Sequence, residues 1–243
     1  MSGKKKSTKP SAKKPVRRLR TQMLRGFVLA IFGGIACALF FAARPQPLSD
    51  LAGFGPQAST EESRDLLGTL EQSVKDGYAV TITEEELNHY LRDTLAGTRR
   101  GVLGDYIHVE HVAARLMPDL AEIILVHDVA GYTLTSSMYL QVTQREAPNG
   151  VMQTSIERHA GPYIDGLPKP MLGGRFGRLP VPQGFLYLSL PAFEALADVY
   201  RNPAGSPKKE IDFIEEMSRV KIEDGKLLLD PVPPMDPSII PTG

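Results

Sequence analysis

The apolar residues of this chain form one continuous run, followed by stretches with helical spacing or strand-like alternation. The run is GFVLAIFGGIACALFFAA, residues 26–43, and its eighteen residues include no charge and no proline. That length is at the lower limit for a helix that crosses about 30 Å of hydrocarbon. The pattern predicts one transmembrane helix ahead of a folded domain.

The charges on the two sides of this run predict its orientation. Residues 1–25 hold ten Lys and Arg and no acid, so all 28 acidic residues and 18 of the 28 basic ones lie beyond them. Basic residues gather on the cytoplasmic side of a membrane span. We therefore expect a single-pass protein of the cell membrane with a cytoplasmic N-terminus and an extracytoplasmic C-terminal domain.

The basic tail, residues 1–25, is rich in Ser, Pro and Lys and has no interleaved aromatic residues. This composition predicts a disordered segment. Its expected partner is the layer of anionic lipid headgroups beside the span, where each base contributes on the order of 1 kcal/mol. Nucleic acid is not expected as a partner, because side chains that stack on bases are missing.

A cleaved signal peptide is the alternative to a retained anchor. The apolar run is longer than a usual signal core, and cleavage after Ala43 would place Phe41 at the minus-three position. Cys37, the only cysteine, is followed by six further apolar residues, unlike the cleavage site of a lipoprotein. We therefore predict a signal anchor and an exported domain that has no disulfide bonds.

Proline and glycine mark the ends of the predicted domain. Residues 44–58 contain three prolines and two glycines without periodicity, which predicts a linker. Residues 231–243 contain five prolines and are expected to form an irregular tail. The domain is therefore expected at residues 59–230, which is long enough to bury a core.

Capping signals and apolar spacing predict four amphipathic helices in this domain. Ser59 with Glu62, and Thr83 with Glu86, have the spacing of capping boxes, so each pair predicts a helix start. The predicted helices run from Ser59 to Gly77, from Thr83 to Gly97, and over residues 190–200 and 208–217.

The remaining periodic segments predict an antiparallel sheet. Strands are expected at residues 78–83, 106–117, 121–129, 132–145 and 151–159, and in a hairpin at residues 220–229. Asp224-Gly225 is a strong signal for the hairpin turn. Residues 161–184 hold six glycines and five prolines and predict an irregular segment that crosses the surface. The order indicates an α+β domain, with amphipathic helices packed on one side of a curved antiparallel sheet.

Motifs for catalysis or metal binding are weak. His108, Glu110 and His111 lie on a predicted strand whose alternation sends His111 to the opposite face. The serines on strands lack a nucleophile-elbow sequence, and the glycine-rich residues 173–177 lack the lysine of a phosphate-binding loop. Glu84, Glu85 and Glu86 suit the first turn of a helix. We therefore expect no enzyme activity, no cofactor and no metal.

Hydrophobic ligand binding is the chemistry that the pattern favours, because helices over a sheet can leave an apolar groove. The residues expected to line it are Leu87, Leu91, Leu95, Phe193, Leu196 and Tyr200. The alternative is that all six belong to an ordinary core.

The segment ITEEELNHYLRDTL, residues 82–95, resembles the opening signature of anchored bacterial envelope proteins of the YpmS type and the YceB lipoprotein type. Residues 176–182, FGRLPVP, and residues 220–229 are similar to later segments of the YpmS type. The resemblance implies an extracytoplasmic α+β domain like the tubular lipid-binding domains. It implies no catalytic residue, and the matched Asn88 is expected to bond to a neighbouring strand or loop.

Together these observations predict an anchored envelope protein that binds a lipid or another hydrophobic molecule near the membrane. The alternative is a structural or interaction module that meets a protein partner in an envelope complex.

Overall fold

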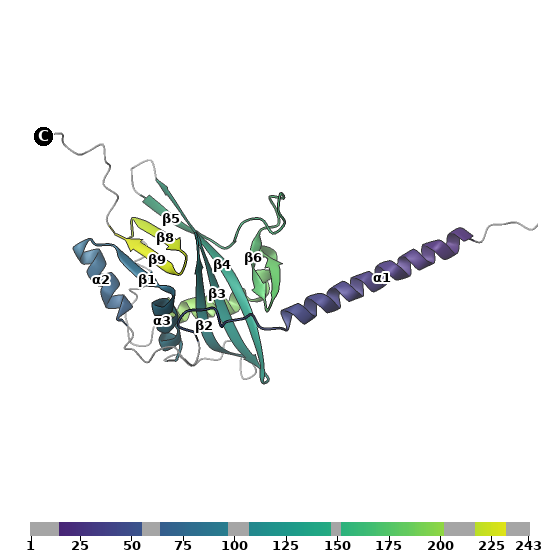
Figure 1. Ribbon diagram of the computed structural model, residues 1–243, viewed down its shortest axis with the longest axis horizontal. Helices are drawn as coiled ribbons and strands as arrows, with labels where there is room; N and C mark the ends of the chain where they lie inside the picture. Colours follow the sequence, from purple (N-terminus) through teal and green to yellow (C-terminus); the bar gives the residue numbers. More distant parts are fainter. Residues whose placement is uncertain (1–14, 55–63, 97–106, 147–151, 202–216, 232–243) are drawn as a thin grey trace, which may run out of the picture. The chain divides into compact units, whose positions relative to one another are not determined.

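The computed structural model describes residues 15–54, 64–96, 107–146, 152–201 and 217–231 (Figure 1). The chain divides into two compact units, Met1–Phe40 and Phe41–Gly243. In the first unit, helix α1 begins at Pro15 and ends at Ala42, just beyond the unit boundary. Its stretch Gln22–Ala42 is long and apolar enough to cross a membrane and buries nothing inside the protein, which fits an anchor or a signal sequence.

The larger sheet of the second unit has six antiparallel strands. They are β2 (Ile107–Met117), β3 (Leu120–Val129), β4 (Tyr132–Glu146), β5 (Met152–Glu157), β6 (Leu172–Phe176) and β7 (Leu179–Pro182). Strands β2 to β5 pair in chain order, as predicted for a meander. The long strand β4 pairs with β6 through Ser136–Met138 and with β5 beyond Leu140, and β7 extends the sheet from β6.

A second, three-stranded sheet has the order β1-β9-β8 (Figure 1). Its strands are β1 (Val80–Thr83), β8 (Arg219–Glu223) and β9 (Lys226–Asp230). The predicted Asp224-Gly225 turn is confirmed, and Gly225 takes the positive φ of 67° that such a turn requires. Both sheets are antiparallel and open, so the α+β class is confirmed.

Three helices of the second unit are α2 (Leu66–Asp76), α3 (Glu84–Ala96) and α4 (Leu190–Arg201), and the 3-10 helix η1 covers Gln183–Leu188. The capping box of α3 is confirmed, because the Glu86 amide donates to Thr83 Oγ1 at 3.1 Å and the Thr83 amide donates to Glu86 Oε2 at 2.8 Å. Helix α2 ends at Gly77 as predicted but begins at Leu66, where the carboxylate of Asp65 caps it.

Two predicted helix signals fall outside the described residues. Ser59 and Glu62, the predicted cap of the first helix, belong to this group, as do residues 208–216 of the predicted fourth helix. Met217, the last residue of that predicted helix, is described and lies outside any helix, buried against Val220 and Leu229.

The prediction of an irregular crossing segment at residues 161–184 is wrong in its second half, which forms the β6–β7 hairpin. Glycine is needed in β6 because a Cβ on Gly174 would collide with the Ser137 carbonyl of β4. The prolines of β7 are tolerated because β7 is an edge strand of the sheet, where a missing N–H breaks no ladder. The same residues that argued against a strand therefore suit this one.

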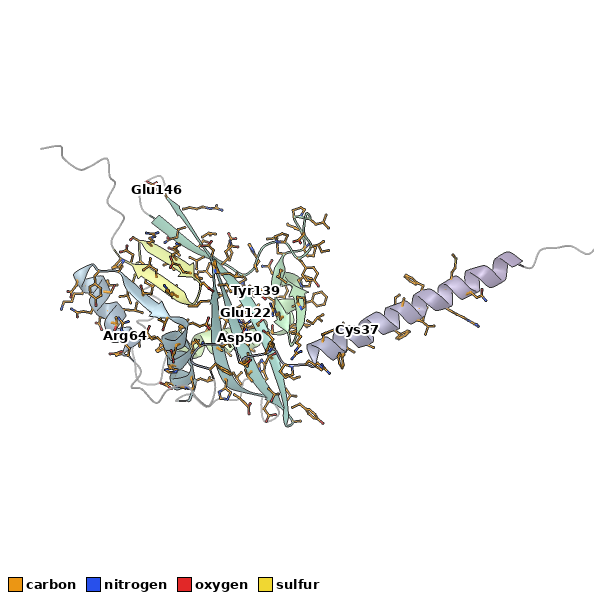
Figure 2. The ribbon with its side chains drawn as sticks, viewed as in Figure 1. Cys37, Asp50, Arg64, Glu122, Tyr139 and Glu146 are labelled. Carbon is orange, nitrogen blue, oxygen red and sulfur yellow. The ribbon has the colours of Figure 1, made fainter. Side chains whose placement is uncertain are left out.

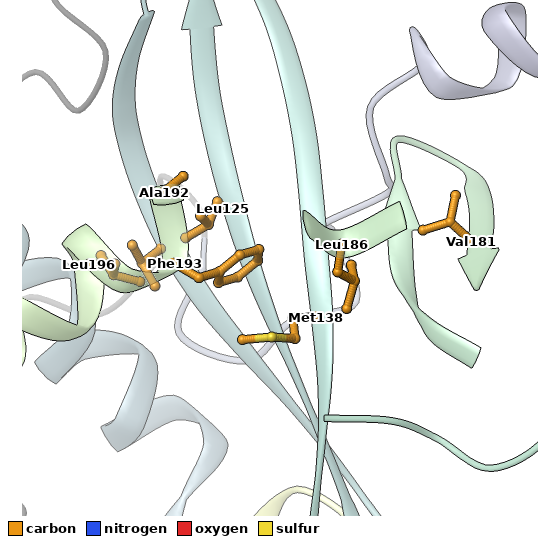
Figure 3. Packing of buried hydrophobic residues seen from close by; sticks show 8 residues of the cluster. Leu125, Met138, Val181, Leu186, Ala192, Phe193 and Leu196 are labelled. Carbon is orange, nitrogen blue, oxygen red and sulfur yellow. The ribbon is translucent and has the colours of Figure 1, made fainter. Parts of the chain in front are cut away.

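One face of the six-stranded sheet carries the main apolar cluster. Phe193 and Leu196 of α4 pack against Val112, Leu125 and Met138 of the sheet (Figure 3). Phe193 is 5% exposed and Leu196 is 7% exposed. At about 25 cal/mol per Å² of apolar surface, each such side chain contributes on the order of 2 kcal/mol through its burial.

The opposite face of the sheet is covered by residues 44–54, which we call the strap. Leu51 packs against Ala113 and Ile124, and Phe54 lies edge-on to His111 with ring centroids 5.8 Å apart. Gln46 is buried, and its backbone N–H donates to Thr135 Oγ1 at 3.0 Å. The segment predicted as a linker thus packs on the domain as far as Phe54.

Asn88 forms hydrogen bonds with the unpaired backbone groups of the edge strand β2, so the predicted bond to a neighbouring strand is confirmed. Its Nδ2 donates to the carbonyls of Ala114 at 3.0 Å and Ala52 at 2.8 Å, and its Oδ1 accepts from the Ala114 amide at 2.6 Å. The side chain therefore joins α3, β2 and the strap and leaves no unpaired group at this buried point.

We expect Asn88→Leu to lower the free energy of unfolding by about 2 kcal/mol, because buried backbone groups of Ala114 and Ala52 lose their partner. A urea titration of the full chain in a mild detergent measures this loss. Asp93→Ala, an exposed change on the same helix, is the control and should leave the midpoint unchanged. An unchanged midpoint for Asn88→Leu would contradict the described bonds.

Candidate functional site

An apolar cavity of about 490 Å³, partly open to solvent, lies between the two sheets. The three-stranded sheet supplies Ile82, Val220, Ile222, Leu227 and Leu229, and the six-stranded sheet supplies residues of β2 to β5. Helices α2, α3 and α4 contribute the remaining lining. Strand alternation directs Ile123, Leu140 and Val142 to this face of the larger sheet, which places their side chains in the cavity wall.

The lining of this cavity suits an uncharged, apolar ligand. Among the described lining residues the only polar groups are the hydroxyls of Tyr90 and Thr154, and none is ionisable at neutral pH. A volume of this size falls within the range of cavities that hold small molecules. A charged headgroup inside it would lose its hydration without gaining a partner. The cavity therefore fits an acyl chain or a similar hydrophobic group.

The structure separates the six residues predicted to line a groove. Leu87 and Leu91 of α3 line the cavity. Leu95, Phe193 and Leu196 belong to the cluster on Val112 and Leu125 and are not in the described lining of the cavity. The side chain of Tyr200 lies outside the described ones. Sequence spacing found the correct face of α3. Helix α4 reaches the cavity through Ala197, which the apolar spacing of residues 190–200 also places on the inward face, and not through the larger Phe193 and Leu196 that were expected to line it.

A buried polar cluster, which the sequence analysis missed, lies on the strap face of the larger sheet (Figure 2). Glu122 is fully buried and accepts from Arg115 Nη1 and from Ser137 Oγ, both at 2.6 Å. Arg115 also donates to the strap, at Pro47 O and at the carboxylate of Asp50. Arg175 Nε donates to Tyr139 Oη at 2.7 Å beside this pair.

The bonds within this cluster indicate that it holds the strap to the sheet. Burial disfavours the charged Arg115, but the charges of Glu122 and Asp50 raise its pKa above the ordinary value. Burial and the neighbouring Glu122 also raise the pKa of Tyr139, so its phenol stays protonated at neutral pH. Both oxygens of Glu122 accept bonds inside the protein, which leaves this carboxylate no role as an exposed acid or base.

His127 lies on the apolar face of β3, where its Nε2 is 3.0 Å from Ser136 Oγ. Its Nδ1 is buried and has no hydrogen-bond partner in the described structure. Burial lowers the pKa of this imidazole below its ordinary 6.5. The imidazole of His127 is therefore neutral in the folded domain at neutral pH.

This lowered pKa predicts how stability depends on pH. The unfolded chain binds a proton near pH 6.5 but the folded chain does not, so stability should fall as the pH drops below about 6.5. In His127→Gln this part of the pH dependence should be absent. Urea midpoints of both proteins above and below pH 6.5 measure the difference. Parallel pH curves would contradict the burial of His127.

No metal site is formed by the described side chains, since no three His, Cys, Asp or Glu residues among them converge. Around His111 the pairing of β2 with β3 shifts register after Val109, so the simple alternation assumed from the sequence is interrupted there. The side chain of His108 lies outside the described ones.

Comparisons with protein-family models, with curated proteins and with solved structures find no match to this chain. The resemblance to the YpmS and YceB types therefore stays a prediction that rests on its short motifs.

Proposed function

We propose that this protein is held in the cell membrane by its N-terminal helix and binds a lipid or another hydrophobic molecule in the cavity between its two sheets. The observation that carries the proposal is the lining of that cavity, which is apolar except for two hydroxyls among its described residues. A water-filled space with such walls is unfavourable, and an apolar occupant would remove the exposed surface from water.

The anchor supports the same function. The stretch Gln22–Ala42 has the length and composition of a membrane span, and the basic residues before it favour an inward N-terminus. An exported domain tethered at this point meets lipid at high local concentration. We therefore place the domain on the extracytoplasmic surface, where it holds one hydrophobic ligand without chemical conversion.

Mass spectrometry of molecules extracted from the purified full chain tests the proposal. The control is a peptide of residues 1–43, which retains whatever lipid the anchor helix alone holds. We expect one hydrophobic species in stoichiometric amount with the full chain and not with the peptide. Identical extracts from both, together with a protein partner that reproducibly crosslinks to the domain, would instead establish the interaction module.

A further inference from the structure

The 3-10 helix η1 exposes large apolar side chains next to a buried one. Phe185, Tyr187 and Leu188 are 56%, 76% and 78% exposed, whereas Leu186 is 5% exposed. Leu186 fits here because Gly173 and Gly174 of β6 leave room for it. Three neighbouring exposed apolar residues on one short turn are unusual for a surface that meets only water, and such patches mark contact sites.

The segment that carries η1 is basic, although the domain is acidic. Residues 158–190 contain the basic residues Arg158, Lys169, Arg175 and Arg178, and Asp165 is their only acidic residue. Beyond residue 25 as a whole, 28 acidic residues outnumber 18 basic ones. Aromatic and leucine side chains beside basic groups are the composition of surfaces that lie in a lipid headgroup layer. Arg175 is engaged with Tyr139 and Glu122, so the charge complementary to an anionic membrane comes from the exposed Arg158, Lys169 and Arg178.

The β6–β7 hairpin fixes this segment to the residues at which α1 ends. The Arg178 amide donates to Phe41 O at 3.0 Å, and Arg178 Nε donates to Pro45 O at 3.2 Å. Gly177, with a φ of 53°, lies against the carbonyls of Ala42 and Arg44 so closely that a Cβ would collide with them. The hairpin turn is therefore held at the point where the chain leaves the apolar helix.

The length of the hairpin limits how far η1 can be from that point. Strand β6 has five residues, and at about 3.3 Å per residue it spans about 17 Å. Helix η1 follows directly after the returning strand β7 and packs back on β6 through Leu186. Helix η1 is therefore packed on the same short hairpin whose turn contacts the residues where α1 ends, the point at which, in the proposed function, the chain leaves the membrane.

We infer that the exposed face of η1, formed by Phe185, Tyr187 and Leu188, is a membrane-contact surface that inserts into the headgroup layer of the membrane holding the anchor. This inference rests on the anchoring part of the proposed function. The domain then has two attachments to the bilayer, α1 and η1. A single attachment would let the domain rotate relative to the membrane, whereas two attachments restrict that rotation. The cavity between the sheets is thereby kept at a constant orientation to its lipid source.

Tryptophan fluorescence tests this contact, because the natural chain has no tryptophan. The test variant is Tyr187→Trp, and the matched control is Tyr132→Trp, since these two tyrosines are 76% and 75% exposed. Each full-length variant is reconstituted in vesicles of phosphatidylcholine and phosphatidylglycerol, with and without bromine atoms on the acyl chains. Phe32→Trp, within α1, reports separately on insertion of the anchor.

We expect Tyr187→Trp to show blue-shifted emission and to lose about half of it or more to brominated chains, as a side chain at the headgroup boundary should. Tyr132→Trp should keep its emission. Quenching of Phe32→Trp without quenching of Tyr187→Trp would overturn the contact and leave the anchor intact. A blue shift of Tyr187→Trp without quenching would overturn it in favour of a protein interface. No quenching of Phe32→Trp would refute the anchor itself.

Discussion

Glu122→Gln should lower the free energy of unfolding by about 3 kcal/mol, because it removes a buried charge from an ion pair. Glu122 is 0% exposed and lies 2.6 Å from Arg115, whose own side chain is 15% exposed. Glutamine keeps the shape and can still accept from Ser137, but it leaves Arg115 without its buried counter-charge. The exposed Asp50 compensates only in part. A urea titration of the full chain in detergent measures the loss.

The same substitution should loosen the strap, which gives a second readout. Arg115 bonds both to Glu122 and to the strap at Pro47 and Asp50, so hydrogen exchange of amides at residues 44–54 should accelerate in Glu122→Gln. The control is Glu223→Gln, which removes an exposed pair with Lys221 at 2.8 Å and should change neither readout. Equal stability of the two variants would contradict the buried cluster.

Ala197→Phe should lower ligand retention about tenfold, a difference of about 1.4 kcal/mol in binding free energy. Ala197 is a partly buried residue of α4 that faces the cavity, and a phenyl ring there would occupy space that the ligand needs. Because the ring fills an apolar space, the stability of the chain should be unchanged or higher. Quantitative mass spectrometry of extracted hydrophobic molecules measures the retention.

Ala79→Phe is the matched control for this variant. Ala79 is exposed ahead of β1 and outside the cavity lining, so the same added ring should leave retention unchanged. Equal retention by Ala197→Phe and Ala79→Phe would show that the bound molecules sit elsewhere, for example on the anchor. A loss of retention together with a large loss of stability would show that Ala197 is packed and does not border a space.

The sequence predicted the elements whose signals are local. The Thr83 and Glu86 box, the stop at Gly77, the Asp224-Gly225 turn and the meander β2 to β5 all depend on residues that are neighbours in the chain or on simple alternation. Their sequence signals lie within short stretches of the chain. They therefore appear in the structure close to where they were expected.

The features that the sequence did not predict depend on contacts between distant segments. In the sequence Gly174 argues against a strand. In the structure a glycine is needed there, because the Ser137 carbonyl lies against it. The strap shows no periodicity because its bonds to the sheet are single and irregular: the backbone N–H of Gln46 donates to Thr135 Oγ1, and its side-chain Nε2 donates to Ser137 Oγ. Glu122 alternates with apolar neighbours like a solvent-facing residue, and only the strap and Arg115 make its burial possible.

The candidate site was predicted only in part, because its lining also depends on contacts between distant segments. Apolar spacing on α3 identified Leu87 and Leu91, which line the cavity. Spacing alone cannot distinguish a residue that borders an open space from one that is packed, and Phe193 and Leu196 are of the second kind. The cavity lies between two sheets, and the smaller sheet forms only when β1 pairs with β9, a strand from the other end of the domain sequence.

The most direct test of ligand binding uses a photoactivatable fatty acid fed to cells that make the full chain. After irradiation, the crosslinked peptides are identified by mass spectrometry. We predict crosslinks on β3, β4 and β8, at or beside Ile123, Leu140 and Ile222, in addition to those on the anchor. Crosslinks confined to residues 22–42, with none on the strands around the cavity, would contradict the proposal that this domain binds a hydrophobic ligand.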